Sequence, residues 1–138
     1  MNRYLPLIGR VLIGLPFVMS GFGKLAAYGK TTAMISAVGL PFPPLAYAVA
    51  VVLELGGGLL MIAGYQVRPV AIAQAIFTIA AAASFHTNFA DQNQMIHFLK
   101  NVMMAGGLLQ ITYFGAGAFS LDARFGRAAA RVASLSAS

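Results

Sequence analysis

Glu54 is the residue whose type and position most need a chemical explanation. It lies in the middle of an apolar stretch from about residue 45 to residue 65, about 15 Å from either end of a helix of that length. If the stretch spans a membrane, an ionisable group at that depth costs roughly 3 kcal/mol unless it is paired or faces a polar cavity. Glu54 is therefore predicted to face the inside of a bundle. It would serve there either as a carboxylate that handles protons or contacts a ligand, or as part of a structural contact.

Arg10 is the predicted partner of Glu54. It lies about two turns into the first apolar stretch, roughly 9 Å from the start of a helix. On an antiparallel neighbour Glu54 would lie only slightly deeper, within reach of an arginine side chain. In the alternative, Arg10 extends to the lipid headgroups and makes no contact with Glu54.

A second group of polar residues gathers where the apolar stretches end on the opposite side of the membrane from the termini. The members in or next to a stretch are Lys24, His86, Asn88, His97, Lys100 and Asn101. His97, Lys100 and Asn101 are spaced by three and four residues, so they share one helix face. Together the group predicts a polar mouth that suits a quinone headgroup, or an anion held by Lys24 and Lys100. The alternative is that these are the ordinary polar ends of membrane helices.

The candidate catalytic residues are Glu54, Arg10 and His86. His86 and His97 also raise haem or metal ligation, since the two imidazoles flank one turn. No third strong ligand accompanies them apart from Asp91, and the chain has no cysteine, so no metal site is predicted. The absence of cysteine excludes thiolate chemistry and Cys-ligated clusters. A quinone is the one cofactor that the pattern suggests, and nothing indicates one built into the chain.

Four apolar stretches must position these residues. They cover about residues 4–22, 45–65, 69–90 and 95–115, and each matches the roughly 20 helical residues that cross a bilayer. Charged residues make up 9% of the chain and mean hydropathy is +0.81, whereas a soluble domain is about 25% charged. The prediction is an all-α integral membrane four-helix bundle. It would form a single domain over residues 1–124, followed by a basic tail over 125–138.

Glycine and proline mark the connections. Residues 31–38 are predicted to form a short interfacial helix between the first two spans, which Gly39 ends before three prolines lead into the next span. The glycines at 56–58 offer a small surface for close helix contact, which makes a homodimer possible.

The net charge of +6 is explained by membrane topology rather than by nucleic acid. Arg3, Arg68, Arg124, Arg127 and Arg131 fall on the side of the termini, against Lys24, Lys30 and Lys100 on the other. Cytoplasmic loops carry the excess of basic residues, so both termini are predicted to be cytoplasmic. The three tail arginines share one helical face. The tail is expected to be either a short helix on anionic lipid or a frayed, solvated segment.

The order of the motifs resembles the DoxX family of small bacterial membrane proteins over about residues 3–124. The residues that carry the resemblance are Arg10, 20–25 (SGFGKL), 39–41 (GLP), 54–57 (ELGG), Gly64, His86 and 115–122 (GAGAFSLD). The resemblance implies a four-helix bundle in the bacterial inner membrane. It also implies shared polar positions at Arg10, Lys24, Glu54, His86 and Asp122.

Two classes of function follow from the resemblance and the residues. Some DoxX relatives are the membrane subunit of a thiosulfate:quinone oxidoreductase, and others accompany redox or detoxification partners. This implies a quinone-linked redox subunit that works with a partner protein. Eukaryotic relatives act as cargo receptors or chaperones, which implies a non-enzymatic scaffold. The first class predicts an open cavity that Glu54, Lys24 and His86 share; the second predicts a Glu54 sealed against Arg10.

Overall fold

The chain is all-helical in its computed structural model, which describes residues 2–137; Met1 and Ser138 lie outside the described residues. The elements in order are α1 (Leu5–Ala26), α2 (Tyr28–Ala37), α3 (Pro43–Val51), the π-helical turn η1 (Val52–Gly56), α4 (Gly57–Ala63), α5 (Val67–Phe85), α6 (Gln92–Phe114) and α7 (Leu121–Ser136). No strand occurs between residues 2 and 137. The predicted all-α fold class is confirmed.

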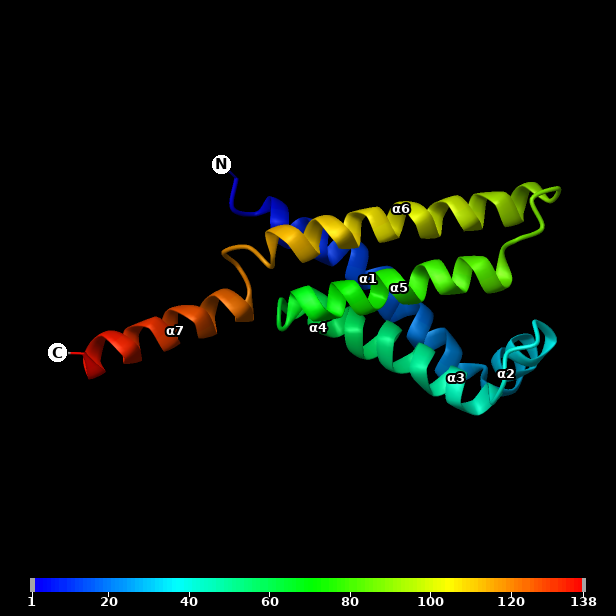
Figure 1. The fold of residues 1–138 in the computed structure, drawn as a ribbon, viewed down its shortest axis with the longest axis horizontal. Coiled ribbons are helices and arrows are strands. Elements are labelled where there is room, and N and C mark those ends of the chain that lie inside the picture. The colour runs from blue at the N-terminus through cyan, green and yellow to red at the C-terminus, as the bar shows by residue number, and fades with distance from the viewer. Residues whose placement is uncertain (1, 138) are drawn as a thin grey trace.

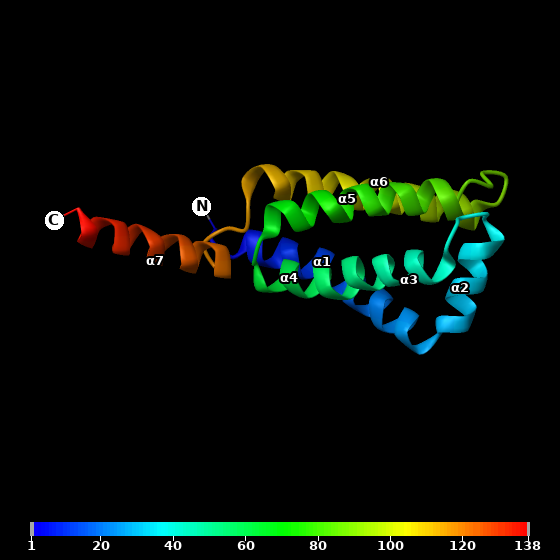
Figure 2. The same ribbon diagram turned by 60° about the horizontal axis from the view of Figure 1, so that its bottom comes forward.

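Three helices in the described part of the chain are long and apolar enough to cross a membrane: α1, the continuous segment Pro43–Ala63, and α5. The fourth predicted span corresponds to α6, which has 23 residues and runs beside α5 (Figures 1 and 2). Its first turns carry amides, a histidine and a lysine, so it is more polar than the other three. The bundle therefore has three strongly apolar helices and one mixed helix.

Burial is inverted relative to a soluble protein. Large apolar side chains face outward at mid-helix, with Leu12, Ile76 and Met103 exposed by 68%, 67% and 73%. The polar side chains within the spans turn inward instead, and the buried ones are Arg10, Glu54, Gln74 and Thr78. Lipid tails solvate the apolar surface, whereas a polar group in hydrocarbon needs a partner inside the protein. This pattern supports the reading of the bundle as an integral membrane protein.

Glycine brings α1 against the second span. A Cβ added at Gly14 would lie 2.9 Å from the carbonyl oxygen of Gly58, and one at Gly58 equally close to that of Gly14. At Gly21 a Cβ would lie 2.7 Å from the backbone nitrogen of Leu55. Small residues allow such backbone contact between membrane helices. Gly58 is therefore occupied by α1, and Gly57 packs against Gln74 of α5, so both glycines of this face make contacts within the chain.

The connection between the first two spans and the one after the third span lie at the same end of the bundle. The first agrees with the prediction, and the second begins earlier than predicted. The expected short helix between the first two spans is present as α2, opposite α7 in Figures 1 and 2. Phe42 takes a left-handed conformation (φ 49°) just before Pro43 begins α3. The third span ends at Phe85 rather than near residue 90, because His86 leaves the helical region (φ −131°, ψ 49°). We call this end of the bundle the α2 end.

The opposite end, which we call the terminal end, holds the start of α1, the α4–α5 turn and the loop after α6. Asp122 joins the segment after α6 to the α4–α5 turn: its carboxylate accepts from the backbone N–H groups of Gln66 (2.7 Å) and Val67 (3.0 Å). These are free donors at the start of α5, so Asp122 acts as its N-terminal cap. From there α7 projects away from the bundle (Figure 1) as a regular helix without buried residues. The alternative of a frayed tail is thus wrong over Leu121–Ser136.

Candidate functional site

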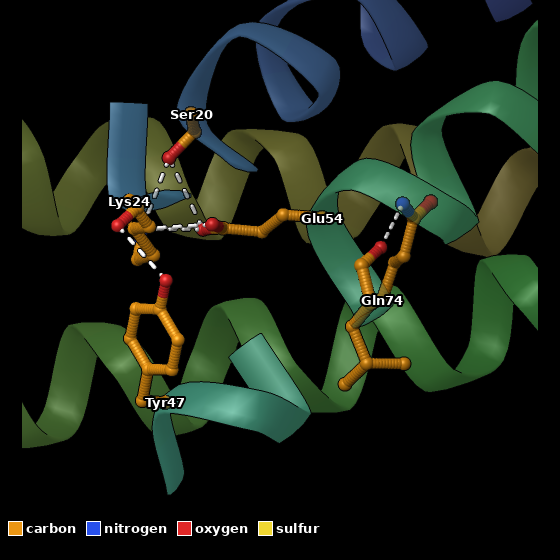
Figure 3. Close-up of polar contacts among 6 residues, drawn as sticks. Ser20, Lys24, Tyr47, Glu54 and Gln74 are labelled. Atoms are coloured by element: carbon orange, nitrogen blue, oxygen red, sulfur yellow. Dashed lines mark hydrogen bonds and ion pairs between the residues drawn. The ribbon is translucent and has the colours of Figure 1, made fainter. Parts of the chain in front are cut away.

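Glu54 is buried and forms an ion pair with Lys24. Lys24 Nζ lies 2.7 Å from Glu54 Oε2 and donates to Oε1 at 3.0 Å. Ser20 Oγ donates to the same Oε1 at 3.2 Å and accepts from Lys24 Nζ at 3.1 Å. The three side chains form a closed triangle between α1 and η1 (Figure 3). The predicted Arg10–Glu54 pair is wrong, because the basic partner comes from the last turn of α1 instead.

Arg10 has a different role at the terminal end. Its Nη1 donates to the carbonyls of Met61 (3.0 Å) and Ile62 (2.9 Å), and its Nη2 to the carbonyl of Phe119. The last carbonyls of a helix have no partner within it, and α4 ends here because Gly64 turns into the left-handed region (φ 74°). Arg10 is 1% exposed and ties the end of α4 to the loop after α6. It does not line the cavity described below.

A π-helical turn presents Glu54. Residues Val52–Gly56 form one wide turn inside an otherwise α-helical span, and such single turns occur frequently at functional sites. Gln74 of α5 supports the turn, since its Nε2 donates to the carbonyl of Leu53 at 2.9 Å (Figure 3). Gln74 is fully buried. Sequence reasoning missed it; the available signal was an amide in the middle of a span without charged residues.

Tyr47 fixes the end of α1 that carries Lys24. Its hydroxyl donates to the Lys24 backbone carbonyl at 3.1 Å (Figure 3). The Tyr47 ring also packs edge-on against Tyr28, with 4.7 Å between ring centroids. These contacts join α1, α2 and α3 near the ion pair. The backbone that carries Lys24 is thus held by a contact from α3, which α2 supports in turn.

A cavity of about 810 Å³ leads from the ion pair to the α2 end, between the second span and the α5–α6 pair. Its walls are mostly apolar, and its polar lining residues are Ser20, Lys24, Thr31, Glu54, Thr78, Ser84, His86, His97, Lys100 and Asn101. Small-molecule sites have volumes of about 300–1,000 Å³, apolar walls and a few convergent polar groups. The cavity therefore has the size and lining of a ligand site.

Six of the eight predicted site residues line this one cavity: Lys24, Glu54, His86, His97, Lys100 and Asn101. Arg10 and Asn88 do not. Asn88 is exposed in the non-helical segment after α5, and Arg10 lies at the terminal end. Thr78 is a lining residue that sequence reasoning missed, because a single threonine in a span carries no signal of its own.

The two histidines meet at the cavity mouth. Their rings stack with 5.0 Å between centroids and 25° between planes, and His86 Nδ1 lies 3.3 Å from Gln94 Oε1. Lys100 is exposed one turn after His97 on α6. Within residues 2–137 no group of three or more metal-binding side chains gathers. The mouth thus offers hydrogen bonds and positive charge.

The fold and the cavity define a class of protein, a small helical membrane bundle with an internal ligand-sized cavity that ends at a buried ion pair. The DoxX family matches this chain over residues 5–87, more than half of its length. The chain therefore belongs to the DoxX family.

Two relatives from Escherichia coli (strain K12) extend the match. The chain is 36% identical to inner membrane protein YqjF over 116 residues, which cover 84% of this chain and 88% of YqjF. It is also 36% identical to inner membrane protein YphA over 123 residues, which cover 86% of this chain and 88% of YphA. No solved structure matches the chain.

Proposed function

We propose that this DoxX-family protein binds a quinone or a similar small amphiphile inside its bundle, as the membrane subunit or accessory protein of a quinone-linked oxidoreductase. One observation carries the proposal: a single ligand-sized cavity contains both the buried Glu54 with its partner Lys24 and the His86–His97 mouth. A scaffold without a ligand would not need an open cavity beside a buried charge.

The residues around the ion pair can recognise a carbonyl oxygen. Lys24 supplies a charged donor whose side chain is 26% exposed, whereas Glu54 behind it is only 8% exposed. A ligand oxygen approaching from the cavity would meet Lys24 Nζ, which Glu54 and Ser20 hold in place. Hydrogen bonds to charged groups contribute about 1.5–3 kcal/mol, so this contact can select a ligand by its polar end.

Reduction of a quinone to a quinol takes up electrons and protons in equal number. The side chains available here, those of Lys24, Glu54 and His86, can hold or deliver protons, but none of them supplies electrons. The electrons would come from a redox partner protein or directly from a reduced substrate brought to the cavity. This division of roles fits a membrane subunit rather than a complete oxidoreductase.

The proposed location is the bacterial inner membrane, with both termini in the cytoplasm. The names of the two relatives and the excess of arginine on the side of the termini support it. In this orientation the cavity mouth at the α2 end would open near the outer leaflet. A quinone dissolved in the bilayer would enter there.

Binding of a short-chain ubiquinone to the purified protein tests the proposal. We expect Glu54→Gln and His86→Ala each to weaken binding by about tenfold or more, with the helical circular dichroism retained. Asn88→Ala is the matched control, because Asn88 neighbours His86 in the chain but does not line the cavity. Wild-type protein that binds no quinone, or an Asn88→Ala effect as large as that of His86→Ala, would contradict the proposal.

A non-enzymatic role as scaffold, chaperone or cargo adapter is the second candidate, and α7 favours it. The helix has 16 residues, none of them buried, and its three arginines lie on one face. A protein partner on the terminal side could use this helix without contacting the cavity. Deleting residues 126–138 would remove most of the helix while keeping the Asp122 cap, so loss of partner function without loss of quinone binding would favour this role.

A further inference from the structure

Thr78 carries a buried hydroxyl group without a partner. The residue is 2% exposed, and its Oγ1 makes no hydrogen bond within the protein. A threonine inside a helix usually avoids this by donating to the carbonyl four residues earlier. Thr32 and Thr112 do so, at 2.9 Å to the carbonyls of Tyr28 and Leu108. Thr78 thus differs from both, and a buried polar atom left unpaired needs an explanation.

The position of Thr78 in the cavity supplies one. Thr78 and Phe77 are the deepest lining residues of α5, about 10 Å from the end of that helix. Glu54 is the deepest lining residue of the second span, about 16 Å from its start at the same end of the bundle. Gln74, one turn before Thr78, donates to the carbonyl of Leu53, so Thr78 lies within about one helical turn of Glu54 along the bundle. We call this deep part of the cavity its floor, and the other lining residues that we assign to it are apolar: Phe17, Phe77 and Met104.

The charge at the floor sets the class of ligand group that fits. Lys24 and Glu54 neutralise each other, and among residues 2–137 Glu54 is the only acidic residue that lines the cavity. A further charge at this depth would be costly without its own counter-ion. A hydroxyl group donates and accepts, so Thr78 can pair with an uncharged carbonyl or hydroxyl but adds no charge to stabilise an anion.

We infer that Thr78 and the Lys24–Glu54 pair form a subsite for the uncharged polar group of an amphiphile that enters the cavity head first. The inference rests on the proposed function, since it takes the cavity as the place where the ligand binds. It narrows the ligand to molecules with a neutral carbonyl or hydroxyl head on an apolar body. An anionic amphiphile such as a fatty acid would instead remain at the mouth, where Lys100 and the two histidines lie.

Thr78→Val tests the subsite, because it removes only the hydroxyl group and keeps the shape of the side chain. We expect it to weaken short-chain ubiquinone binding about three- to tenfold, the range for one neutral hydrogen bond. The melting temperature of the ligand-free protein should stay the same or rise, since no internal hydrogen bond is lost. Thr78→Ser, which keeps the hydroxyl, should bind within about twofold of wild type.

Thr112→Val is the matched control. It removes a hydroxyl that is bonded within α6 and lies outside the cavity lining, so binding should be unchanged. Decanoate is the anionic comparison: Lys100→Gln should weaken its binding, and Thr78→Val should not.

Equal ubiquinone affinity for Thr78→Val and wild type would overturn the subsite while leaving the proposed function intact. A lower melting temperature for Thr78→Val with unchanged affinity would do the same, because it would make the hydroxyl structural. A wild-type protein that binds no ubiquinone would overturn both. If Thr78→Val weakens decanoate binding more than ubiquinone binding, Thr78 contacts the anionic headgroup. That result would overturn the inference that the subsite binds an uncharged group.

Discussion

Each end of the bundle contains a buried ionisable residue, and the two residues have different kinds of hydrogen-bond partner. At the terminal end Arg10 is almost completely buried, and backbone carbonyls of Met61, Ile62 and Phe119 accept from its guanidinium group. Towards the α2 end, Glu54 is held by two side chains, those of Lys24 and Ser20, beside an open cavity. Arg10 is sealed by the main chain, whereas Glu54 is reachable through its partner.

The difference separates architecture from chemistry. A guanidinium bonded to carbonyls at the end of a helix joins segments, and the remaining donor of Arg10, its Nε, is buried away from the cavity lining. A carboxylate paired with a partly exposed lysine can change partners when a ligand arrives, because both groups are side chains with alternative rotamers. Substitutions at Arg10 should therefore act on stability, and substitutions at the ion pair should act on stability and on binding together.

Arg10→Met should have the largest effect. The substitution removes the donor of the Ile62 and Phe119 carbonyls, whereas the Met61 carbonyl still accepts from the backbone N–H of Gly64. Each buried polar group left unpaired costs about 1–3 kcal/mol. We expect a loss of at least about 2 kcal/mol, measured as a steep fall in melting temperature by circular dichroism.

Arg10→Lys is the informative control for that loss. Its ammonium group is compact and lacks the planar fork of a guanidinium, so it should recover only part of the stability. Any Arg10→Met protein that remains folded should bind ubiquinone like wild type. A selective loss of binding without loss of stability would place Arg10 at the ligand site and remove the contrast between the two ends.

Lys24→Met should cost more stability than Glu54→Gln, by about 1–2 kcal/mol. The first leaves Glu54, whose side chain is 8% exposed, without a counter-charge; the second leaves Lys24, which is 26% exposed and can reach water. The double variant should be more stable than Lys24→Met alone, because it removes the stranded carboxylate. Thermal unfolding of the three variants checks this order, and a double variant with purely additive losses would show that the two residues are not coupled.

Much of this arrangement could be predicted from the sequence because it depends on side-chain polarity. The depth of Glu54 predicted its burial, and the spacing of His97, Lys100 and Asn101 predicted that they share a face near His86. The short helix α2 followed from Gly39 and the prolines after it. In each case the structure depends on side-chain types that the sequence gives directly.

The partners of Arg10 could not be predicted in this way, because they are backbone carbonyls that every residue carries. Pairing Glu54 with Arg10 on depth alone ignores that α4 ends at Gly64, where the carbonyl of Ile62 becomes available to Arg10. The π-helical turn was equally hidden, since no residue type specifies it. Gln74 contacts the turn at the Leu53 carbonyl, and this contact forms only when α5 lies against the second span.

The smallest expected effect is a difference in stability between alanine substitutions at two adjacent glycines, Gly56 and Gly57. A Cβ at Gly57 would lie 2.8 Å from Gln74 Nε2, whereas nothing lies within 4 Å of a Cβ at Gly56. Gly57→Ala should therefore push the amide away from the Leu53 carbonyl and cost about 1 kcal/mol, with a weaker affinity for ubiquinone because the turn that presents Glu54 relaxes. Gly56→Ala should be neutral or stabilising by up to about 1 kcal/mol. If melting temperatures and affinities of the two variants agree, Gln74 does not hold the turn, and the position of Glu54 follows from its contacts with Lys24 and Ser20 alone.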